Sequence, residues 1–317
     1  MSMGADIAIL GGGAWGRALA VLAQRAGCTA VLWARQPRNV SFSDARIAVT
    51  GDLAAVRAPI VLLAVPAKAV RAVAAAWATT GGSGVRVSCA KGFDPASGRM
   101  LADVLAADAP AGPVAVLSGP TFAAEAVRGV PTAATVACAD QAVADRVAAV
   151  LGSPTFRLYT TTDVIGVEAA GAFKNVLAIA CGIADGMALG DNARAALITR
   201  GLAELARLAA GLGGRAETVM GLAGLGDVVL TCTSGQSRNY AFGHRLGEGR
   251  SIDEALAASA GVVEGAVTAA SLLARGRSLG LDLPVTEAVD AVLNRGADLK
   301  ATAMGLLARP SRGAETA

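Results

Sequence analysis

The feature that most constrains this chain is a glycine pattern close to its start. A short apolar run at residues 6–10 stops at three glycines, and an alanine- and leucine-rich helical pattern follows over residues 15–24. Gly11, Gly13 and Gly16 form the spacing G-x-G-x-x-G between the predicted strand and helix. The first glycine permits a tight turn, the second lets the backbone approach a pyrophosphate, and the third lets the helix pack closely on the sheet. This pattern is typical of a dinucleotide-binding loop, in which N–H groups at a helix N-terminus face phosphate.

The rest of the chain falls into two parts with different patterns. Further short apolar runs, separated by alanine-rich helical stretches, lie at residues 30–33, 60–65, 85–89 and 114–117. Their alternation predicts an α/β fold with a parallel, doubly wound sheet covered by helices on both faces. From Thr161 onward, long helical patterns follow at 163–183, 193–212, 252–258, 263–279 and 284–293. We therefore expect an N-terminal Rossmann-type domain (1–162), a C-terminal all-helical domain (163–309) and a flexible tail (310–317).

Composition argues against several classes of protein. With 54% hydrophobic residues the chain is too apolar to be intrinsically disordered. One of its longest charge-free windows, 109–124, is broken by three prolines, so we expect no membrane-spanning segment. The net charge of +3 comes without a dense basic stripe, which argues against nucleic-acid binding. The five cysteines include no C-x-x-C pair, so we expect no metal site, and reduced thiols in a cytoplasmic protein.

The end of the second predicted strand bears on the choice of cofactor. The sequence there is Trp33-Ala34-Arg35, without the carboxylate that usually binds the ribose of NAD. The Arg35 guanidinium can pair with a 2′-phosphate, which favours NADP(H), with NAD(H) as the alternative. The other interpretation of Arg35 is that it is an ordinary surface arginine.

Lysine is rare in this chain and therefore informative. Of the 28 basic residues only four are lysines: Lys68, Lys91, Lys174 and Lys300. A lysine in an arginine-rich sequence indicates a position that needs an amine able to release a proton. Lys174 lies in the middle of an apolar helical pattern, with Asn175 beside it. Either it faces solvent, or it occupies a partly dry site where desolvation lowers its pKa and suits it to transfer protons.

Other polar residues extend the candidate site. Asp227 and Thr231 are four residues apart and would share one helix face, where they could orient an amine and a substrate hydroxyl. Asp227 could also act as a helix N-cap. Arg238 and Asn239 form a possible fork for phosphate or carboxylate, or else belong to an exposed loop. Lys91 and Thr121 each follow a predicted strand, where open parallel sheets bind ligands.

Several segments in order over nearly the whole chain resemble the bacterial NAD(P)-dependent glycerol-3-phosphate dehydrogenases. They are the glycine loop through AWG, the KG at Lys91, SGPTFA, GAFKNVLAIACGIADG, GLAGLGDVVLTCTS and SRN. The resemblance implies a Rossmann domain followed by a helical domain, and a homodimer. It further implies reversible reduction of dihydroxyacetone phosphate to sn-glycerol 3-phosphate, which supplies the backbone of glycerophospholipids.

The resemblance also implies roles for individual residues. Lys174 is similar to the catalytic proton donor and acceptor, with Asp227 positioning its amine. The residues similar to substrate contacts are Lys91, Gly119, Thr121, Asp227, Ser237, Arg238 and Asn239, to which the helical pattern adds Asn175 and Thr231. Those similar to cofactor contacts, besides the three loop glycines, are Ala14, Trp15, Arg35, Lys91, Ala123, Arg238, Val262 and Glu264.

The sequence departs from these enzymes in one stretch, and two other functions remain as alternatives. The stretch 36–58 is shorter than is usual in these enzymes and lies near the adenine end of the cofactor, so it bears on the preference between NADP and NAD. The first alternative is a related two-domain dehydrogenase acting on another hydroxyacid or polyol phosphate. The second is a nucleotide-binding module without catalysis, which the presence of Lys174 and Asp227 disfavours.

Overall fold

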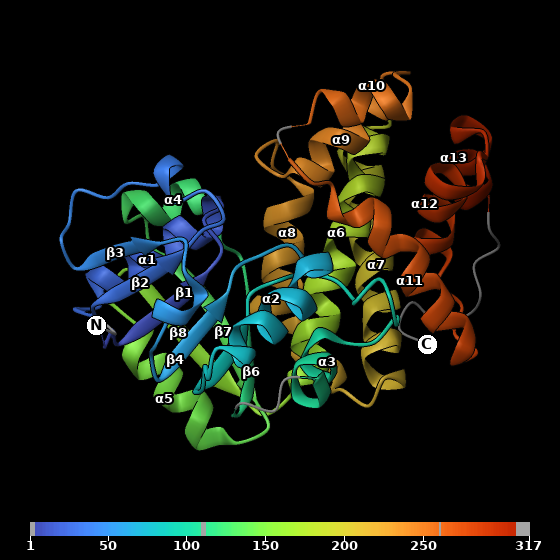
Figure 1. The fold of residues 1–317 in the computed structure, drawn as a ribbon. Coiled ribbons are helices and arrows are strands. Elements are labelled where there is room, and N and C mark those ends of the chain that lie inside the picture. The colour runs from blue at the N-terminus through green and yellow to red at the C-terminus, as the bar shows by residue number, and fades with distance from the viewer. Residues whose placement is uncertain (1–3, 109–111, 260, 309–317) are drawn as a thin grey trace. The chain divides into compact units, whose positions relative to one another are not determined.

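An eight-stranded sheet lies at the centre of the N-terminal part of the computed structural model (Figure 1), which describes residues 4–108, 112–259 and 261–308. The strand order is β3-β2-β1-β4-β5-β6-β7-β8. The strands are β1 (Ile7–Leu10), β2 (Ala30–Trp33), β3 (Ile47–Thr50), β4 (Ile60–Leu63), β5 (Val85–Ser88), β6 (Val114–Ser118), β7 (Thr132–Cys138) and β8 (Phe156–Thr161). The Rossmann-type α/β prediction is therefore confirmed.

The sheet is not wholly parallel, which corrects the prediction. Strands β1 to β6 pair in parallel and so do β7 and β8, but β7 runs antiparallel to β6. The helix between them, α4 (Ala123–Arg128), has six residues and rises about 9 Å, less than the roughly 17 Å length of β6. Because this helix cannot return the chain to the start of β6, the next strand enters the sheet from the opposite end.

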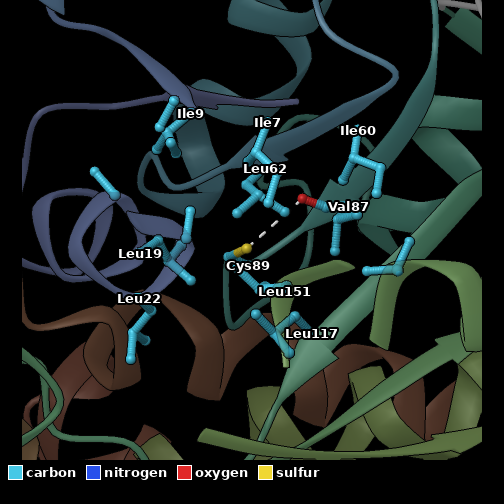
Figure 2. Close-up of a cluster of buried hydrophobic side chains, with 14 of the residues drawn as sticks. Ile7, Ile9, Leu19, Leu22, Ile60, Leu62, Val87, Cys89, Leu117 and Leu151 are labelled. Atoms are coloured by element: carbon cyan, nitrogen blue, oxygen red, sulfur yellow. Dashed lines mark hydrogen bonds between the residues drawn. The ribbon is translucent and has the colours of Figure 1, made fainter. Parts of the chain in front are cut away.

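Helices cover both faces of the sheet, as a nearly parallel sheet requires. On one face, α1 (Ala14–Arg25) and α5 (Gln141–Leu151) contribute Leu19, Leu22 and Leu151 to a core that Figure 2 shows against Ile9 and Leu62. On the other face, α2 (Ala67–Thr79) and α3 (Leu101–Asp108) form a second core. Strands β1, β2, β4 and β5 are buried along their whole length, which explains their continuous apolar runs.

The C-terminal part is helical in all its described elements, as predicted. It comprises α6 (Val164–Gly186), α7 (Asp191–Gly211), α8 (Asp227–Cys232), α9 (Arg238–Gly247), α10 (Ile252–Ala257), α11 (Glu264–Ser278), α12 (Pro284–Arg295) and α13 (Leu299–Leu307). By length and composition α6 could cross a membrane, but 78% of its apolar window is buried inside the structure. This is the pattern of a core helix.

The chain divides into two compact units, Met1–Glu168 and Ala169–Ala317, called the N-terminal and C-terminal units below. The division falls six residues after the expected boundary at 162, inside α6, so this helix starts in one unit and continues into the other. Asp163 caps the helix by accepting a hydrogen bond from the Gly166 N–H at 2.9 Å. The expected tail, 310–317, lies outside the described residues.

Some elements were not predicted from the sequence. They are the strands β3, β7 and β8 and the helices α4, α5, α8, α9 and α13. Strand β7, with the sequence TAATVAC, consists of small residues that are equally compatible with a helix. Its strand conformation depends on pairing with β6 and β8, which local sequence does not reveal.

Candidate functional site

The glycine loop joins β1 to the N-terminus of α1, as the sequence predicts. Gly11 adopts a left-handed φ of +132° and donates its N–H to the Trp33 carbonyl at 2.9 Å. A Cβ at Gly16 would lie 1.8 Å from the Gly11 oxygen, so α1 can approach the loop this closely only with glycine there. Gly13 differs, because a Cβ on it would meet no atom within 4 Å.

This loop leaves a helix N-terminus open to an anion. Gly13 is the N-cap of α1 and supplies no side-chain cap, and the first helical turn contains no acidic residue. Ala14 and Gly13 are exposed and Trp15 is half-buried. The first N–H groups of a helix need acceptors, and the helix dipole favours negative charge at this end. The loop therefore fits a pyrophosphate, and Gly13 leaves the approach to these N–H groups free of side-chain atoms.

Arg35 is exposed just beyond the end of β2. A second arginine, which the sequence analysis missed, links this region to the glycine loop. Arg17 on α1 donates to the Gly12 carbonyl at 2.9 Å and to the Asn39 carbonyl at 3.1 Å. The segment that follows β2 is thereby held against the loop. Arg17 resembles any other surface arginine in the sequence, so no local signal distinguishes it.

Three predicted residues of the N-terminal unit meet at one carbonyl group. Lys91 Nζ donates to the Gly119 oxygen at 3.2 Å, and Thr121 Oγ1 donates to the same oxygen at 3.3 Å. Lys91 follows β5 and Gly119 follows β6, which are neighbouring parallel strands. The prediction that these residues share one edge of the sheet is confirmed. Ala123, also predicted, is the half-buried first residue of α4.

Lys174 on α6 is buried, with 8% of its surface exposed, so the solvent-facing alternative is wrong. Its Nζ lies 2.6 Å from Asp227 Oδ1 and 3.0 Å from Thr231 Oγ1. Thr231 Oγ1 also donates to Asp227 Oδ1 at 3.2 Å. The amine, carboxylate and hydroxyl therefore form a closed triangle in the C-terminal unit.

The segment before Asp227 explains how the carboxylate reaches the amine. Residues Leu222–Gly226 form a turn of π-helix that leads directly into α8. Gly226 is the N-cap of α8, so Asp227 occupies the first helical position and its side chain is not the N-cap. Asp227 and Thr231 share one face of α8, as their spacing of four residues predicts. Turns of π-helix are frequent at functional sites.

Asn175 and Asn239 are brought together although they are 64 residues apart. Asn239 Nδ2 donates to Asn175 Oδ1 at 2.9 Å, and both side chains are buried. Ser237, the N-cap of α9, accepts the Tyr240 N–H at 3.2 Å. Arg238, the first residue of α9, is exposed. Arg238 and Asn239 thus lie at the capped start of a helix, and the alternative of an ordinary exposed loop is wrong.

The predicted cofactor contacts near α11 lie close to Arg238. A Cβ at Gly261 would lie 2.9 Å from a guanidinium nitrogen of Arg238. Val262 is exposed, and Glu264, half-buried, is the first residue of α11. Arg238, Val262 and Glu264 therefore belong to one region of the C-terminal unit.

Cysteine and metal chemistry find no support in the part of the chain that the structure describes. Its five cysteines are buried and free. Burial raises the pKa of Cys89 to about 12, and burial also raises that of Cys232, which follows Thr231. These thiols are therefore poor nucleophiles. No three His, Cys, Asp or Glu side chains among the described residues lie close enough to hold a metal ion.

Two family models together match most of the chain. The model described as NAD-dependent glycerol-3-phosphate dehydrogenase N-terminus matches residues 6–47 and 38–144. The model described as NAD-dependent glycerol-3-phosphate dehydrogenase C-terminus matches residues 163–304. The matches thus cover the glycine loop and the segment that contains Lys174, Asp227 and Asn239.

Curated relatives and a solved structure agree with the family models. The glycerol-3-phosphate dehydrogenase [NAD(P)+] of Rhodospirillum rubrum is 47% identical over 324 residues, covering 96% of this chain and 93% of the relative. That of Methylobacterium radiotolerans is 47% identical over 333 residues, covering 99% of each chain. The crystal structure of glycerol-3-phosphate dehydrogenase from Coxiella burnetii superposes with a TM-score of 0.90 at 36% identity, covering 96% of this chain and 98% of that one. This chain therefore belongs to the NAD-dependent glycerol-3-phosphate dehydrogenase family.

Proposed function

We propose that this protein catalyses the reversible, NAD(P)H-dependent reduction of dihydroxyacetone phosphate to sn-glycerol 3-phosphate. The observation that carries the proposal is the buried triangle of Lys174, Asp227 and Thr231, which supplies a held amine for proton transfer. The glycine loop at the N-terminus of α1 supports binding of a dinucleotide. The relatives named glycerol-3-phosphate dehydrogenase [NAD(P)+] support the choice of substrate.

Lys174 acts as the proton donor in the direction of reduction. When bound, the nicotinamide supplies the hydride that adds to the ketone carbon of the substrate. As negative charge develops on the former carbonyl oxygen, the protonated Lys174 amine gives it a proton, and the amine takes one back in the reverse direction. Asp227 holds the amine and stabilises its charged form, and Thr231 fixes its direction.

The remaining predicted residues bind and orient the substrate and cofactor. In the proposal, Arg238 anchors the phosphate of the substrate, and Lys91, Gly119, Thr121 and Ser237 are further substrate contacts. Binding energy gained at the phosphate, away from the reacting carbon, fixes the geometry of the carbonyl. The first N–H groups of α1 bind the pyrophosphate of the cofactor, and Arg35 binds the 2′-phosphate of NADP(H).

The first test is oxidation of NADPH and NADH, followed at 340 nm, with dihydroxyacetone phosphate and with non-phosphorylated ketones and keto acids. We expect turnover with the phosphorylated ketone. Arg238→Ala should raise the KM for dihydroxyacetone phosphate at least tenfold, and inorganic phosphate should compete with the substrate of the unaltered protein. Arg35→Ala should weaken the binding of NADPH more than the binding of NADH. Turnover with a keto acid in place of the phosphorylated ketone would contradict the proposal.

The cellular setting is part of the proposal. We propose a cytoplasmic homodimer whose product enters glycerophospholipid synthesis. The free, buried cysteines support a reducing compartment. Sedimentation of the purified protein would measure the oligomeric state.

A further inference from the structure

The segment that follows β2 presents two exposed arginines three residues apart. Arg35 lies just beyond the strand, and Arg38 is the middle residue of a turn of 3-10 helix, Pro37–Asn39. In the part of the chain that the structure describes, neither guanidinium has a hydrogen-bond or ion-pair partner. Even in a fully extended chain their Cα atoms would be at most about 11 Å apart, and the turn shortens this distance. Two long side chains at this spacing can converge on one group of a ligand.

The acidic residues nearest in sequence do not neutralise these two arginines. Asp44 is the only acidic residue of the segment 34–46, and its carboxylate is paired with Arg46 at 2.9 Å. Asp52, which follows β3, accepts the Ala54 N–H at 2.8 Å and caps the next turn. The positive charge beyond the end of β2 is therefore available to an anion from solution.

The backbone of this turn is held in place from two sides. On one side, Arg17 donates to the Gly12 carbonyl at 2.9 Å and to the Asn39 carbonyl at 3.1 Å, which ties the end of the turn to the glycine loop. On the other side, a Cβ at Gly51 would lie 3.2 Å from the Pro37 ring. The backbone that carries both arginines is thus fixed relative to the glycine loop, so little ordering is needed when a ligand binds.

A phosphate monoester suits a pair of guanidinium groups. It carries about 1.5 to 2 negative charges near pH 7 and has three acceptor oxygens, so one arginine neither neutralises it nor satisfies all of its oxygens. Guanidinium groups donate paired N–H groups to phosphate oxygens. In a dinucleotide whose pyrophosphate lies at the start of α1, the adenosine ribose lies near the end of the second strand. The phosphate monoester that distinguishes NADP(H) from NAD(H) is attached to the 2′-oxygen of this ribose.

We propose that Arg38 is a second determinant of cofactor specificity, which binds the 2′-phosphate of NADP(H) together with Arg35. The sequence analysis assigned this role to Arg35 alone. The inference rests on the proposed function, because it specifies which anionic group the end of β2 recognises. It also gives a consequence to the short stretch 36–58, whose first turn supplies the second cation.

The test is the affinity of four proteins for NADPH and for NADH, measured by fluorescence titration without substrate. The proteins are the wild type, Arg35→Ala, Arg38→Ala and the double variant. Arg38→Ala should raise the Kd for NADPH about 5- to 50-fold, because hydrogen bonds to charged groups are strong but weaken where water has access. The Kd for NADH should change less than about twofold. The double variant should bind NADPH no more tightly than NADH.

Fragments of the cofactor and a matched arginine variant serve as controls. In calorimetry, Arg38→Ala should weaken the binding of adenosine 2′,5′-bisphosphate by the same factor as that of NADPH. The affinity for adenosine 5′-monophosphate, which has no 2′-phosphate, should not change. Arg157→Ala removes the same charge from an exposed position on β8, at the edge of the sheet farther from β2, and should leave the Kd of both cofactors unchanged.

If Arg38→Ala changed the Kd of NADPH and NADH by equal factors, or changed neither, Arg38 would be an ordinary solvated arginine and the inference would be overturned. Arg38→Glu reverses the charge and should weaken NADPH binding more than Arg38→Ala does, and a smaller loss would also overturn it. Failure of the proposed function would be seen separately, as binding of NADPH without turnover of dihydroxyacetone phosphate. A wild-type protein that bound neither cofactor would overturn this inference together with the dinucleotide site.

Discussion

At the scale of single residues, two opposing effects act on the Lys174 amine. Its burial disfavours the charged form, whereas the Asp227 carboxylate 2.6 Å away favours it. Attraction between charges this close is strong in a site that is largely dry. We therefore expect a protonated amine that is held in one direction by Asp227 and Thr231 and is ready to donate.

Replacing this amine should abolish proton transfer and leave cofactor binding intact. Lys174→Ala should lower kcat by about 10²- to 10⁴-fold, the usual contribution of a general acid. The Kd for NADPH, measured by fluorescence titration, should change less than twofold. Lys300→Ala, at an exposed position on α13, is the matched control and should retain full turnover. Turnover near the wild-type value in Lys174→Ala would remove this residue from the mechanism.

At the scale of elements, the packing of α6 against α9 depends on four glycines. Gly182 and Gly186 on α6 face the backbone of α9, and Gly243 and Gly247 on α9 face the backbone of α6. A Cβ at any of them would lie 2.1 to 2.3 Å from a backbone oxygen of the other helix. This contact places the start of α9, with Arg238 and Asn239, beside the part of α6 that contains Asn175.

Two glycine substitutions distinguish the effect of this helix contact on stability from the effect of helix propensity. Alanine normally stabilises a helix by about 1 kcal/mol relative to glycine. Gly305→Ala on α13, where a Cβ would meet no atom within 4 Å, should therefore raise stability slightly. Gly243→Ala should instead destabilise the protein by roughly 1–3 kcal/mol, as overpacking does. Urea unfolding of the two variants measures both effects, and an increase in stability for Gly243→Ala would contradict the packing described.

Two substitutions in the glycine loop form a second matched pair of variants. Gly13→Ala introduces a methyl group into open space, so the protein should fold with an unchanged Tm. The methyl group would occupy the approach of the pyrophosphate, and we expect the Kd for NADPH and NADH to rise at least tenfold. Gly16→Ala places its methyl group 1.8 Å from the Gly11 oxygen and should lower the Tm as well. Unchanged cofactor affinity in Gly13→Ala would exclude this loop as the pyrophosphate site.

At the scale of the whole molecule, each unit contains a buried glutamate that accepts hydrogen bonds from the N-terminus of a helix. Glu168 accepts from the Leu101 N–H at 2.5 Å, and Glu204 accepts from the Val285 N–H at 2.5 Å. Burial raises the pKa of Glu168 to about 8 and that of Glu204 to about 7, from a usual 4.5. Both carboxyls are therefore protonated in the folded protein at pH values where the unfolded chain ionises.

Stability should decrease between about pH 4.5 and pH 8 on account of these two groups. In this range the folded state binds more protons than the unfolded state, so the free energy of unfolding falls as pH rises, by up to about 1.4 kcal/mol per pH unit for each group. Glu168→Gln retains an acceptor for the Leu101 N–H and does not titrate. The stability of the wild type relative to this variant should therefore fall by more than about 1 kcal/mol between pH 5 and pH 8.

The control for this titration is Glu217→Gln, at an exposed position in the C-terminal unit. Its stability relative to the wild type should not depend on pH over the same range. If the free energies of unfolding of Glu168→Gln and the wild type differ by a constant amount from pH 5 to pH 8, Glu168 ionises alike in the folded and unfolded chain.

Local sequence determined the main features of this protein. The G-x-G-x-x-G spacing predicted a strand, a turn and a helix, and Gly11 and Gly16 do meet backbone atoms at short range. The continuous apolar runs predicted buried parallel strands, and the apolar surroundings of Lys174 left a solvent-facing and a partly dry amine as alternatives, between which its burial decided. The spacing of Asp227 and Thr231 placed them on one helix face. Each of these inferences depends on residues a few positions apart, whose geometry the backbone fixes.

Only the tertiary structure decided the contacts between distant segments. The antiparallel entry of β7 follows from the shortness of α4 and from pairing with β6, and Ala-rich sequence is compatible with either outcome. The pairing of Asn175 with Asn239, and of Asn239 with Gly265, joins residues up to 64 positions apart. It depends on how closely three helix backbones pack. Such packing is the sum of many small contacts between elements, and no short stretch of sequence contains it.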